Sequence, residues 1–173
     1  MSSRRSTDRS PGPLYTAEER RRRDASPWTV VQGVLAPVQF LVFAVSLVLI
    51  ARYLVTGTGL AAANLSVVAK TATLYAIMVT GSIWEKQVFG RYLFARPFFW
   101  EDVFSMAVLA LHTAYLVAYA YALLPPAGLM ALALAAYAAY LVNAGQFLWK
   151  LRQARLQGAA AAPRAGALPE PAP

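Results

Sequence analysis

The chain has 173 residues, of which 58% are hydrophobic and 14% are charged, and its mean hydropathy is +0.46. Soluble domains carry about 25% charged residues, so this composition excludes an ordinary soluble globule and favours a protein that folds in a bilayer. The formal net charge of +8 could suggest nucleic acid, but the basic residues gather beside the apolar segments. They are better explained as topology signals and contacts with lipid headgroups, so we expect no nucleic-acid partner.

The two ends of the chain lack apolar periodicity. Residues 1–24 are rich in arginine and are predicted to form a mobile cytoplasmic head, and the Ala- and Pro-rich tail at 157–173 is predicted to be disordered. Within the head, the stretch LYTAEERRRRDASPW places Thr16 three residues before Glu19, which is the spacing of a capping box, and Pro27 is a stop signal. This pattern predicts a short surface helix.

Four segments are long and apolar enough to cross a bilayer, which takes about 20 helical residues. They run over about 28–54, 65–89, 101–124 and 128–149. The first is too long for a secretory signal peptide, and no cleavage site follows it. Because the connections are short, successive helices should be antiparallel neighbours. The predicted fold is therefore an all-α membrane protein, with a four-transmembrane-helix antiparallel bundle over residues 25–156 and disordered termini.

Basic residues are distributed unevenly over the ends of these segments. Seven arginines precede the first segment, and other basic residues on the same predicted side include Lys86, Arg91, Arg96, Lys150, Arg152 and Arg155. The two remaining connections carry only Arg52. The positive-inside rule therefore places both termini in the cytoplasm.

The connection between the second and third segments gathers the acidic residues of the middle of the chain. Glu85, Glu101 and Asp102 stand at the ends of the two segments that meet there, so we expect them to be neighbours. One interpretation is structural, since acids stabilise the start of a helix and Glu85 has Arg91 and Arg96 as possible partners. The other is functional, because ionisable side chains at an apolar boundary are costly and usually have a role.

His112 is the only histidine of the chain. It follows Glu101 by eleven residues, which puts both on nearly one face of a helix, roughly 16 Å apart. Without a second histidine a zinc site built by the protein is not expected, but a metal that arrives with a ligand needs only one. A packing residue, a proton carrier and a metal ligand remain open interpretations of His112.

The other polar and aromatic residues of the segments allow a structural and a functional interpretation. Most of the polar ones are expected to form helix–helix hydrogen bonds, and Lys70 is near enough to a helix end to snorkel. Tyr137 is suited either to packing or to lining a pocket. Residues placed in the interfacial aromatic belt are Trp84, Trp100 and Trp149.

Several long strings of the sequence are unusual: RRRRDASPWTVVQGVLAPVQFLVF, IWEKQVFG, YLFARPFFWEDVFS, ALHTAYL and NAGQFLWKLRQARL. Through them the chain resembles, over about Leu14 to Leu156, the 2-vinyl bacteriochlorophyllide hydratases of bacteriochlorophyll biosynthesis. Arg91 and Arg96 are departures from the expected pattern. The resemblance implies a lyase that adds water to the vinyl group of a chlorin to give a 1-hydroxyethyl group, which a separate dehydrogenase then oxidises.

The resemblance also implies a cellular setting and partners. It implies the inner, intracytoplasmic photosynthetic membrane of a phototrophic bacterium. A chlorophyllide substrate, membrane lipid and the downstream dehydrogenase are the implied partners. No cofactor is expected, since water is the co-substrate and the substrate carries its own magnesium.

The resemblance names no catalytic residues, so the candidate site follows from physical reasoning. Hydration of a vinyl group requires an acid that protonates the terminal carbon and a base that orients water, and a carboxyl in apolar surroundings can hold a proton near neutral pH. Glu85 and Glu101 are the candidate donors. The preferred hypothesis takes Glu101 as the acid and Glu85 or Asp102 as the base.

In the same hypothesis His112 is the axial ligand of the substrate's magnesium. The residues expected to contact the macrocycle are Trp100, Tyr75 and Tyr137. A reversed version makes His112 the base and the acids anchors. A non-catalytic pigment carrier or assembly factor is the alternative function, and a small proton-coupled transporter is a third, although the chain lacks broken-helix symmetry.

Overall fold

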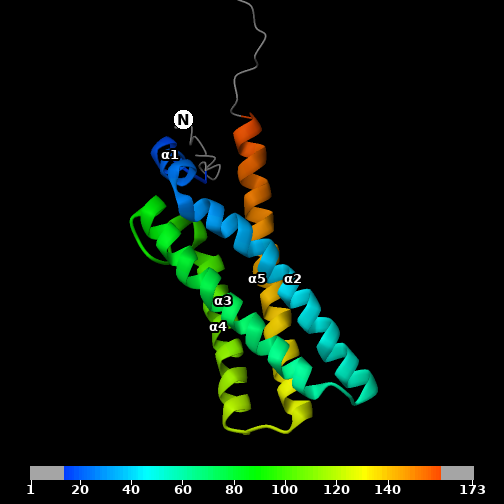
Figure 1. The fold of residues 1–173 in the computed structure, drawn as a ribbon. Coiled ribbons are helices and arrows are strands. Elements are labelled where there is room, and N and C mark those ends of the chain that lie inside the picture. Colours follow the sequence, from blue (N-terminus) through cyan, green and yellow to red (C-terminus); the bar gives the residue numbers. More distant parts are fainter. Residues whose placement is uncertain (1–13, 161–173) are drawn as a thin grey trace, which may run out of the picture.

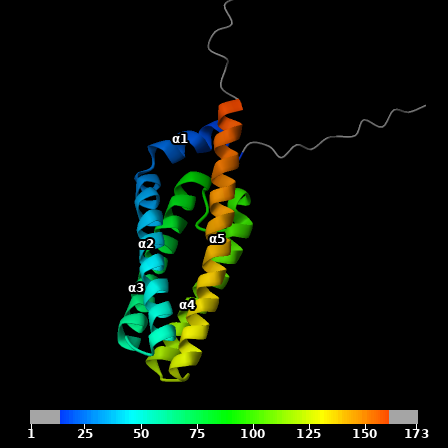
Figure 2. The same ribbon diagram turned by 90° about the vertical axis from the view of Figure 1, so that its right-hand side faces the viewer.

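The computed structural model describes residues 14–160. Over this part the chain is all-helical, with α1 (Ala17–Ala25), α2 (Pro27–Thr56), α3 (Leu60–Phe89), the 3-10 turn η1 (Arg96–Phe98), α4 (Phe99–Ala120) and α5 (Pro126–Ala160). The four long helices form an elongated bundle, and α1 lies across one end of it (Figures 1 and 2). We call this the α1 end. The last turns of α5 lie at the same end.

The predicted fold class is confirmed. Four helices are long and apolar enough to cross a membrane: Pro27–Thr56, Leu60–Phe89, Arg96–Ala120 and Pro126–Leu156. The fourth begins at Pro126 rather than at the predicted 128, because proline suits the first turn of a helix. The third ends at Ala120 rather than at 124, since Ala122 is left-handed with a φ of 51° and Pro125 disfavours helix in the residue before it. Residues 1–13 of the predicted mobile head and residues 161–173 of the predicted disordered tail lie outside the described residues.

Local signals set the ends of the helices. At the start of α1 the Thr16 hydroxyl accepts a hydrogen bond from the Glu19 amide, and the Glu19 carboxylate accepts one from the Thr16 amide at 2.7 Å. The predicted capping box is therefore present. α2 and α3 end at Gly57 and Gly90, whose φ values of 70° and 83° are left-handed and would strain a side chain with a Cβ.

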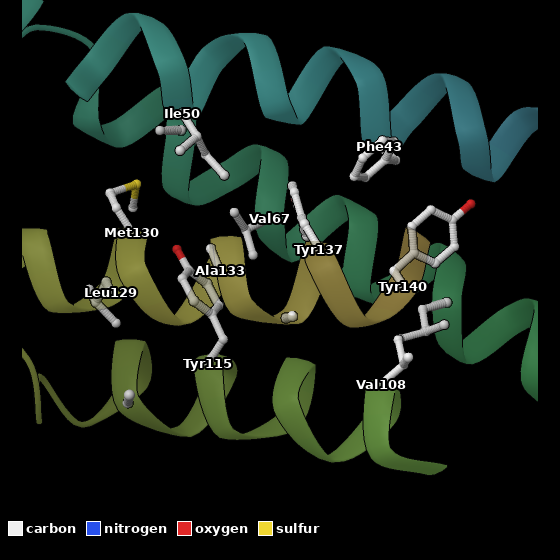
Figure 3. Close-up of a cluster of buried hydrophobic side chains, with 14 residues drawn as sticks. Phe43, Ile50, Val67, Val108, Tyr115, Leu129, Met130, Ala133, Tyr137 and Tyr140 are labelled. Atoms are coloured by element: carbon white, nitrogen blue, oxygen red, sulfur yellow. The ribbon is translucent and has the colours of Figure 1, made fainter. Parts of the chain in front are cut away.

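The bundle consists of two helical hairpins, α2 with α3 and α4 with α5. Their apolar faces meet in one core, whose largest members include Phe43, Ile50, Val67, Val108, Tyr115, Met130 and Tyr137 (Figure 3). Hydrogen bonds also join the hairpins. The Ser46 and Tyr137 hydroxyls lie 2.5 Å apart, and the Tyr115 hydroxyl donates to Asn64 Oδ1 at 2.8 Å. Packing and such buried polar contacts are what hold membrane helices together.

An aromatic cluster closes the α1 end of the bundle; its members are Tyr15, Trp84, Phe89, Phe98 and Phe147. The Tyr15 ring stacks on Phe89 with centroids 5.8 Å apart, and Phe98 stacks on Phe147 at 6.0 Å. Trp84 packs inside this cluster and donates its indole N–H to the Thr29 hydroxyl at 2.9 Å. Because Phe98 is the last residue of η1, the cluster fixes the point where α4 begins.

Candidate active site

The structure brings Glu85, Glu101 and Asp102 together at the α1 end, although α3 and α4 supply them from opposite sides of a loop. Glu85 lies in the last turns of α3, and the other two lie in the first turn of α4. Their exposed fractions are only 5%, 7% and 3%. Neither Arg91 nor Arg96 forms an ion pair with Glu85 in the described part of the chain. The three carboxyls therefore form a buried group.

Glu85 and Asp102 form a pair of neighbouring buried carboxyl groups. Two consecutive amides of the connecting loop support the pair: Phe94 N–H donates to Asp102 Oδ2 at 2.7 Å, and Ala95 N–H donates to Glu85 Oε2 at 3.2 Å. Phe94 has a φ of 59°, a left-handed conformation that costs a non-glycine residue about 1–3 kcal/mol. The loop is thus held in a conformation that directs both amides at the pair.

The proximity of the two carboxyls has a chemical consequence. Two carboxylates side by side in a buried position repel each other, and a proton kept on one of them relieves this repulsion. The Glu85–Asp102 pair is therefore suited to hold a transferable proton in a nearly solvent-free position.

Glu101 has a different environment. Its Oε2 atom lies 2.6 Å from Nζ of Lys150 on α5, and the same ammonium also donates to the carbonyl of Pro97. The hydrogen bond to an ammonium group distinguishes Glu101 from the Glu85–Asp102 pair and suits it to a charge-stabilising role. The ion pair also ties the last turns of α5 to the start of α4.

His112 is fully buried in the middle of the bundle. Its Nδ1 lies 2.8 Å from the Val108 carbonyl, which accepts only, so Nδ1 carries the proton and the lone pair is on Nε2 in the neutral ring. Nε2 has no partner among the described residues. The ring stacks on Tyr137 with centroids 5.8 Å apart. His112 thus presents a free nitrogen ligand on α4, about three helical turns from Glu101.

The predicted contact residues are dispersed. Trp100 is 67% exposed on the outside of α4, so the structure does not bring it together with the carboxyls. Tyr75 shares a hydrogen bond with Thr113 at 2.8 Å, partway along α3. Tyr137 lies in the core beside His112. Lys70 does not snorkel as predicted: it is completely buried with its Nζ 3.8 Å above the Tyr140 ring, because that ring offers the ammonium a nearer partner than the helix end.

Two further observations concern metal binding and the hollows of the surface. No group of three or more His, Cys, Asp or Glu side chains in residues 14–160 is arranged to hold a metal ion. A shallow apolar hollow of about 570 Å³ lies at the start of α2, lined by Pro27, Val30, Val31, Val34 and Leu35. None of the three carboxyls lines it.

Two parts of this site were missed by sequence reasoning. Lys150 was interpreted as a topology signal, yet it follows the buried Asn143 by seven residues, which is the same face of a helix, and this spacing could have indicated that it points inward. The amides of Phe94 and Ala95 had no sequence signal, because a left-handed phenylalanine is set by its surroundings.

Fold and site together define a class: a four-helix membrane protein with a buried group of carboxyls at one end of its bundle. A family model described as 2-vinyl bacteriochlorophyllide hydratase matches residues 15–153. A protein of that name from Rhodobacter capsulatus is 66% identical over 146 residues, which is 84% of this chain and 85% of that protein. One from Cereibacter sphaeroides is 66% identical over 149 residues, 86% of this chain and 92% of that protein.

The chain therefore belongs to the 2-vinyl bacteriochlorophyllide hydratase family, and the predicted resemblance is confirmed. No solved structure matches the chain.

Proposed function

We propose that this protein is a hydro-lyase that adds water to the vinyl group of a bacteriochlorophyllide, giving the 1-hydroxyethyl derivative. Two relatives of this name, each 66% identical over most of the chain, support the activity. The observation that carries the chemistry is the buried Glu85–Asp102 pair, two neighbouring carboxyls held by consecutive loop amides.

The pair accounts for both proton transfers of the reaction. It protonates the terminal vinyl carbon, so the carbon–carbon π bond breaks, a C–H bond forms, and a cation remains on the carbon next to the macrocycle, which delocalises the charge. Water then attacks that carbon and returns its proton to the pair. The pair ends in its starting state, and only water is consumed. This makes Glu85 rather than Glu101 the preferred acid, with Asp102 as its partner.

Glu101 stabilises the cation in this scheme. Its carboxyl group is held in place by Lys150, and a carboxylate oriented in an apolar site acts strongly on developing positive charge. Lys150 keeps Glu101 oriented and is a positioning residue. The amides of Phe94 and Ala95 hold the pair in place while its proton moves.

The substrate supplies its own magnesium, and the protein needs no cofactor. His112 is the candidate axial ligand, because its unpartnered Nε2 carries the lone pair that a magnesium ion would accept. Tyr137, stacked on the His112 ring, and Tyr75 are candidate contacts of the macrocycle. Trp100 would contact only a part of the substrate that extends outside the bundle.

The protein spans the inner, intracytoplasmic membrane of a photosynthetic bacterium, with the α1 end and both termini on the cytoplasmic side. The clustering of arginine and lysine at the α1 end supports this orientation. The active site then faces the compartment in which water and the downstream dehydrogenase are available. That dehydrogenase, which consumes the hydroxyethyl product, is the expected protein partner.

Product analysis tests the function directly. Membranes from a host that makes only the vinyl pigment are compared with and without this protein, and the pigments are separated by chromatography. A hydroxyethyl product that depends on the protein supports the hydratase. Pigment that binds and remains unchanged would instead identify a carrier or assembly factor.

A further inference from the structure

All four long helices carry buried polar atoms that have no hydrogen-bond partner among the described residues. They are Gln39 Oε1, Lys70 Nζ, His112 Nε2, Asn143 Oδ1 and Gln146 Oε1. Buried polar atoms in folded proteins are nearly always bonded to protein, water or ligand. Five unpartnered atoms inside one bundle therefore indicate that something binds there.

Lys70 is the most informative of the five. Its side chain is 0% exposed, and its only close partner is the face of the Tyr140 ring, 3.8 Å from Nζ. None of the ion pairs among the described residues includes Lys70. An aromatic face compensates only part of the cost of burying an ammonium group. An anion is the partner that would offset the rest of this cost.

The position of Lys70 relates it to the carboxyl site. Tyr140, which lies under the ammonium, precedes Lys150 on α5 by ten residues, so about 15 Å of helix separates Lys70 from the Glu101–Lys150 ion pair. His112 stacks on Tyr137, and Lys70 lies over Tyr140, three residues further along the same face of α5. Closer to the carboxyls, the Asn143 amide donates to Ser105 at 2.8 Å. Polar side chains thus recur along the bundle interior between the carboxyls and Lys70.

We infer that Lys70 binds the free carboxylate of the substrate. This inference rests on the proposed function. A chlorophyllide carries an unesterified propionate, whereas a chlorophyll carries a long-chain ester there, and the propionate stands on an edge of the macrocycle well separated from the vinyl group. With the propionate at Lys70, the flat ring lies past His112 and the vinyl edge is directed at the Glu85–Asp102 pair.

The same contact makes Lys70 a specificity residue. A substrate that supplies a carboxylate pairs with the buried ammonium, while an esterified pigment leaves it unpaired.

Binding of two matched ligands tests the inference. The purified full-length protein in detergent is titrated with a vinyl chlorophyllide and with its methyl ester, and pigment absorption reports binding. We expect the wild type to bind the acid roughly 10- to 100-fold more tightly than the ester, as is usual for a charged hydrogen bond. Lys70→Met should remove this preference and leave ester binding unchanged, and Lys70→Arg should retain most of it. Lys86→Met, which changes an exposed lysine of the same helix, is the control.

Thermal unfolding without ligand separates recognition from a structural role. Lys70→Met replaces an unpaired buried charge with an apolar side chain of similar length, so its melting temperature should be no lower than that of the wild type. Equal binding of acid and ester by the wild type would overturn the inference, even if the variant failed to fold. So would an equal loss of both ligands in Lys70→Met. A wild type that prefers the acid but forms no hydroxyethyl product would refute the proposed function and leave the carboxylate site standing.

Discussion

At the residue scale, the two acids of the pair and Glu101 differ in what surrounds them rather than in chemical type. Glu85 and Asp102 face each other and accept hydrogen bonds from loop amides, while Glu101 faces an ammonium group. Carboxyls in different surroundings adopt different protonation states, and enzymes use such differences to assign acid and base roles. The roles proposed here follow from these contacts.

Replacing Glu85 with Gln should abolish most of the activity. The amide preserves the size of the side chain and can still hydrogen-bond to Asp102, but it has no proton to transfer, so kcat should fall by about 10²- to 10⁴-fold. Formation of hydroxyethyl pigment in membranes, with substrate binding measured separately, is the assay. Glu18→Gln on exposed α1 is the control. Near-normal turnover in Glu85→Gln would remove this residue from the chemistry.

Replacing Lys150 with Met should destabilise the protein by about 1.5–3 kcal/mol, because Glu101 stays buried and loses its charged hydrogen bond. The double variant Lys150→Met/Glu101→Gln should recover part of this loss, since its carboxamide needs no ammonium partner. Unfolding in detergent measures both effects, with Arg152→Met on the exposed side of α5 as the control. Additive losses in the double variant would show that the two residues are not coupled.

At the element scale, the loop between α3 and α4 matters as much as the helices. The aromatic cluster anchors η1, and the left-handed Phe94 directs two amides at the pair. Helix α1 and the residue Tyr15 before it contact the end of α3: Tyr15 stacks on Phe89, and Arg22 donates to the Val88 carbonyl. The arginine-rich segment is therefore joined to the end of the bundle that holds the site.

Two neighbouring phenylalanines at the start of α4 can test whether the aromatic cluster anchors this helix. Phe98 is 3% exposed and Phe99 is 43% exposed. Phe98→Ala should remove about 3–5 kcal/mol of packing at the start of α4 and, by displacing Glu101 and Asp102, most of the activity. Phe99→Ala should change both far less. Activity assays and unfolding in detergent on the two variants would reveal the difference, and equal effects would argue against the anchoring role of the cluster.

At the scale of the whole molecule, the two hairpins are joined by a few buried hydrogen bonds and one apolar core. The bonds come from Ser46 with Tyr137 and from Tyr115 with Asn64. Because the proposed substrate lies between elements of both hairpins, their alignment sets the distance from the pair to His112 and Lys70.

Tyr115→Phe tests the coupling of the hairpins. The change leaves Asn64 Oδ1 buried without its donor, which should cost about 1–3 kcal/mol of stability. The matched control is Tyr119→Phe, one turn along the same helix, where the side chain is more exposed and the change should be nearly neutral. Thermal unfolding followed by tryptophan fluorescence is the measurement. A Tyr115→Phe protein as stable as the wild type would show that this bond does not hold the hairpins together.

The sequence by itself determined the four helices, their approximate ends and the capping box of α1, because hydropathy, helix length and cap chemistry act locally. It also placed the three acids at one connection. Only the tertiary structure decided which acid meets which partner, that Lys150 turns inward to Glu101, and that Lys70 stays inside the bundle over Tyr140. Those outcomes depend on contacts between helices far apart in the chain, and in a membrane many helical faces are equally apolar, so the sequence carries little signal for the order in which they pack.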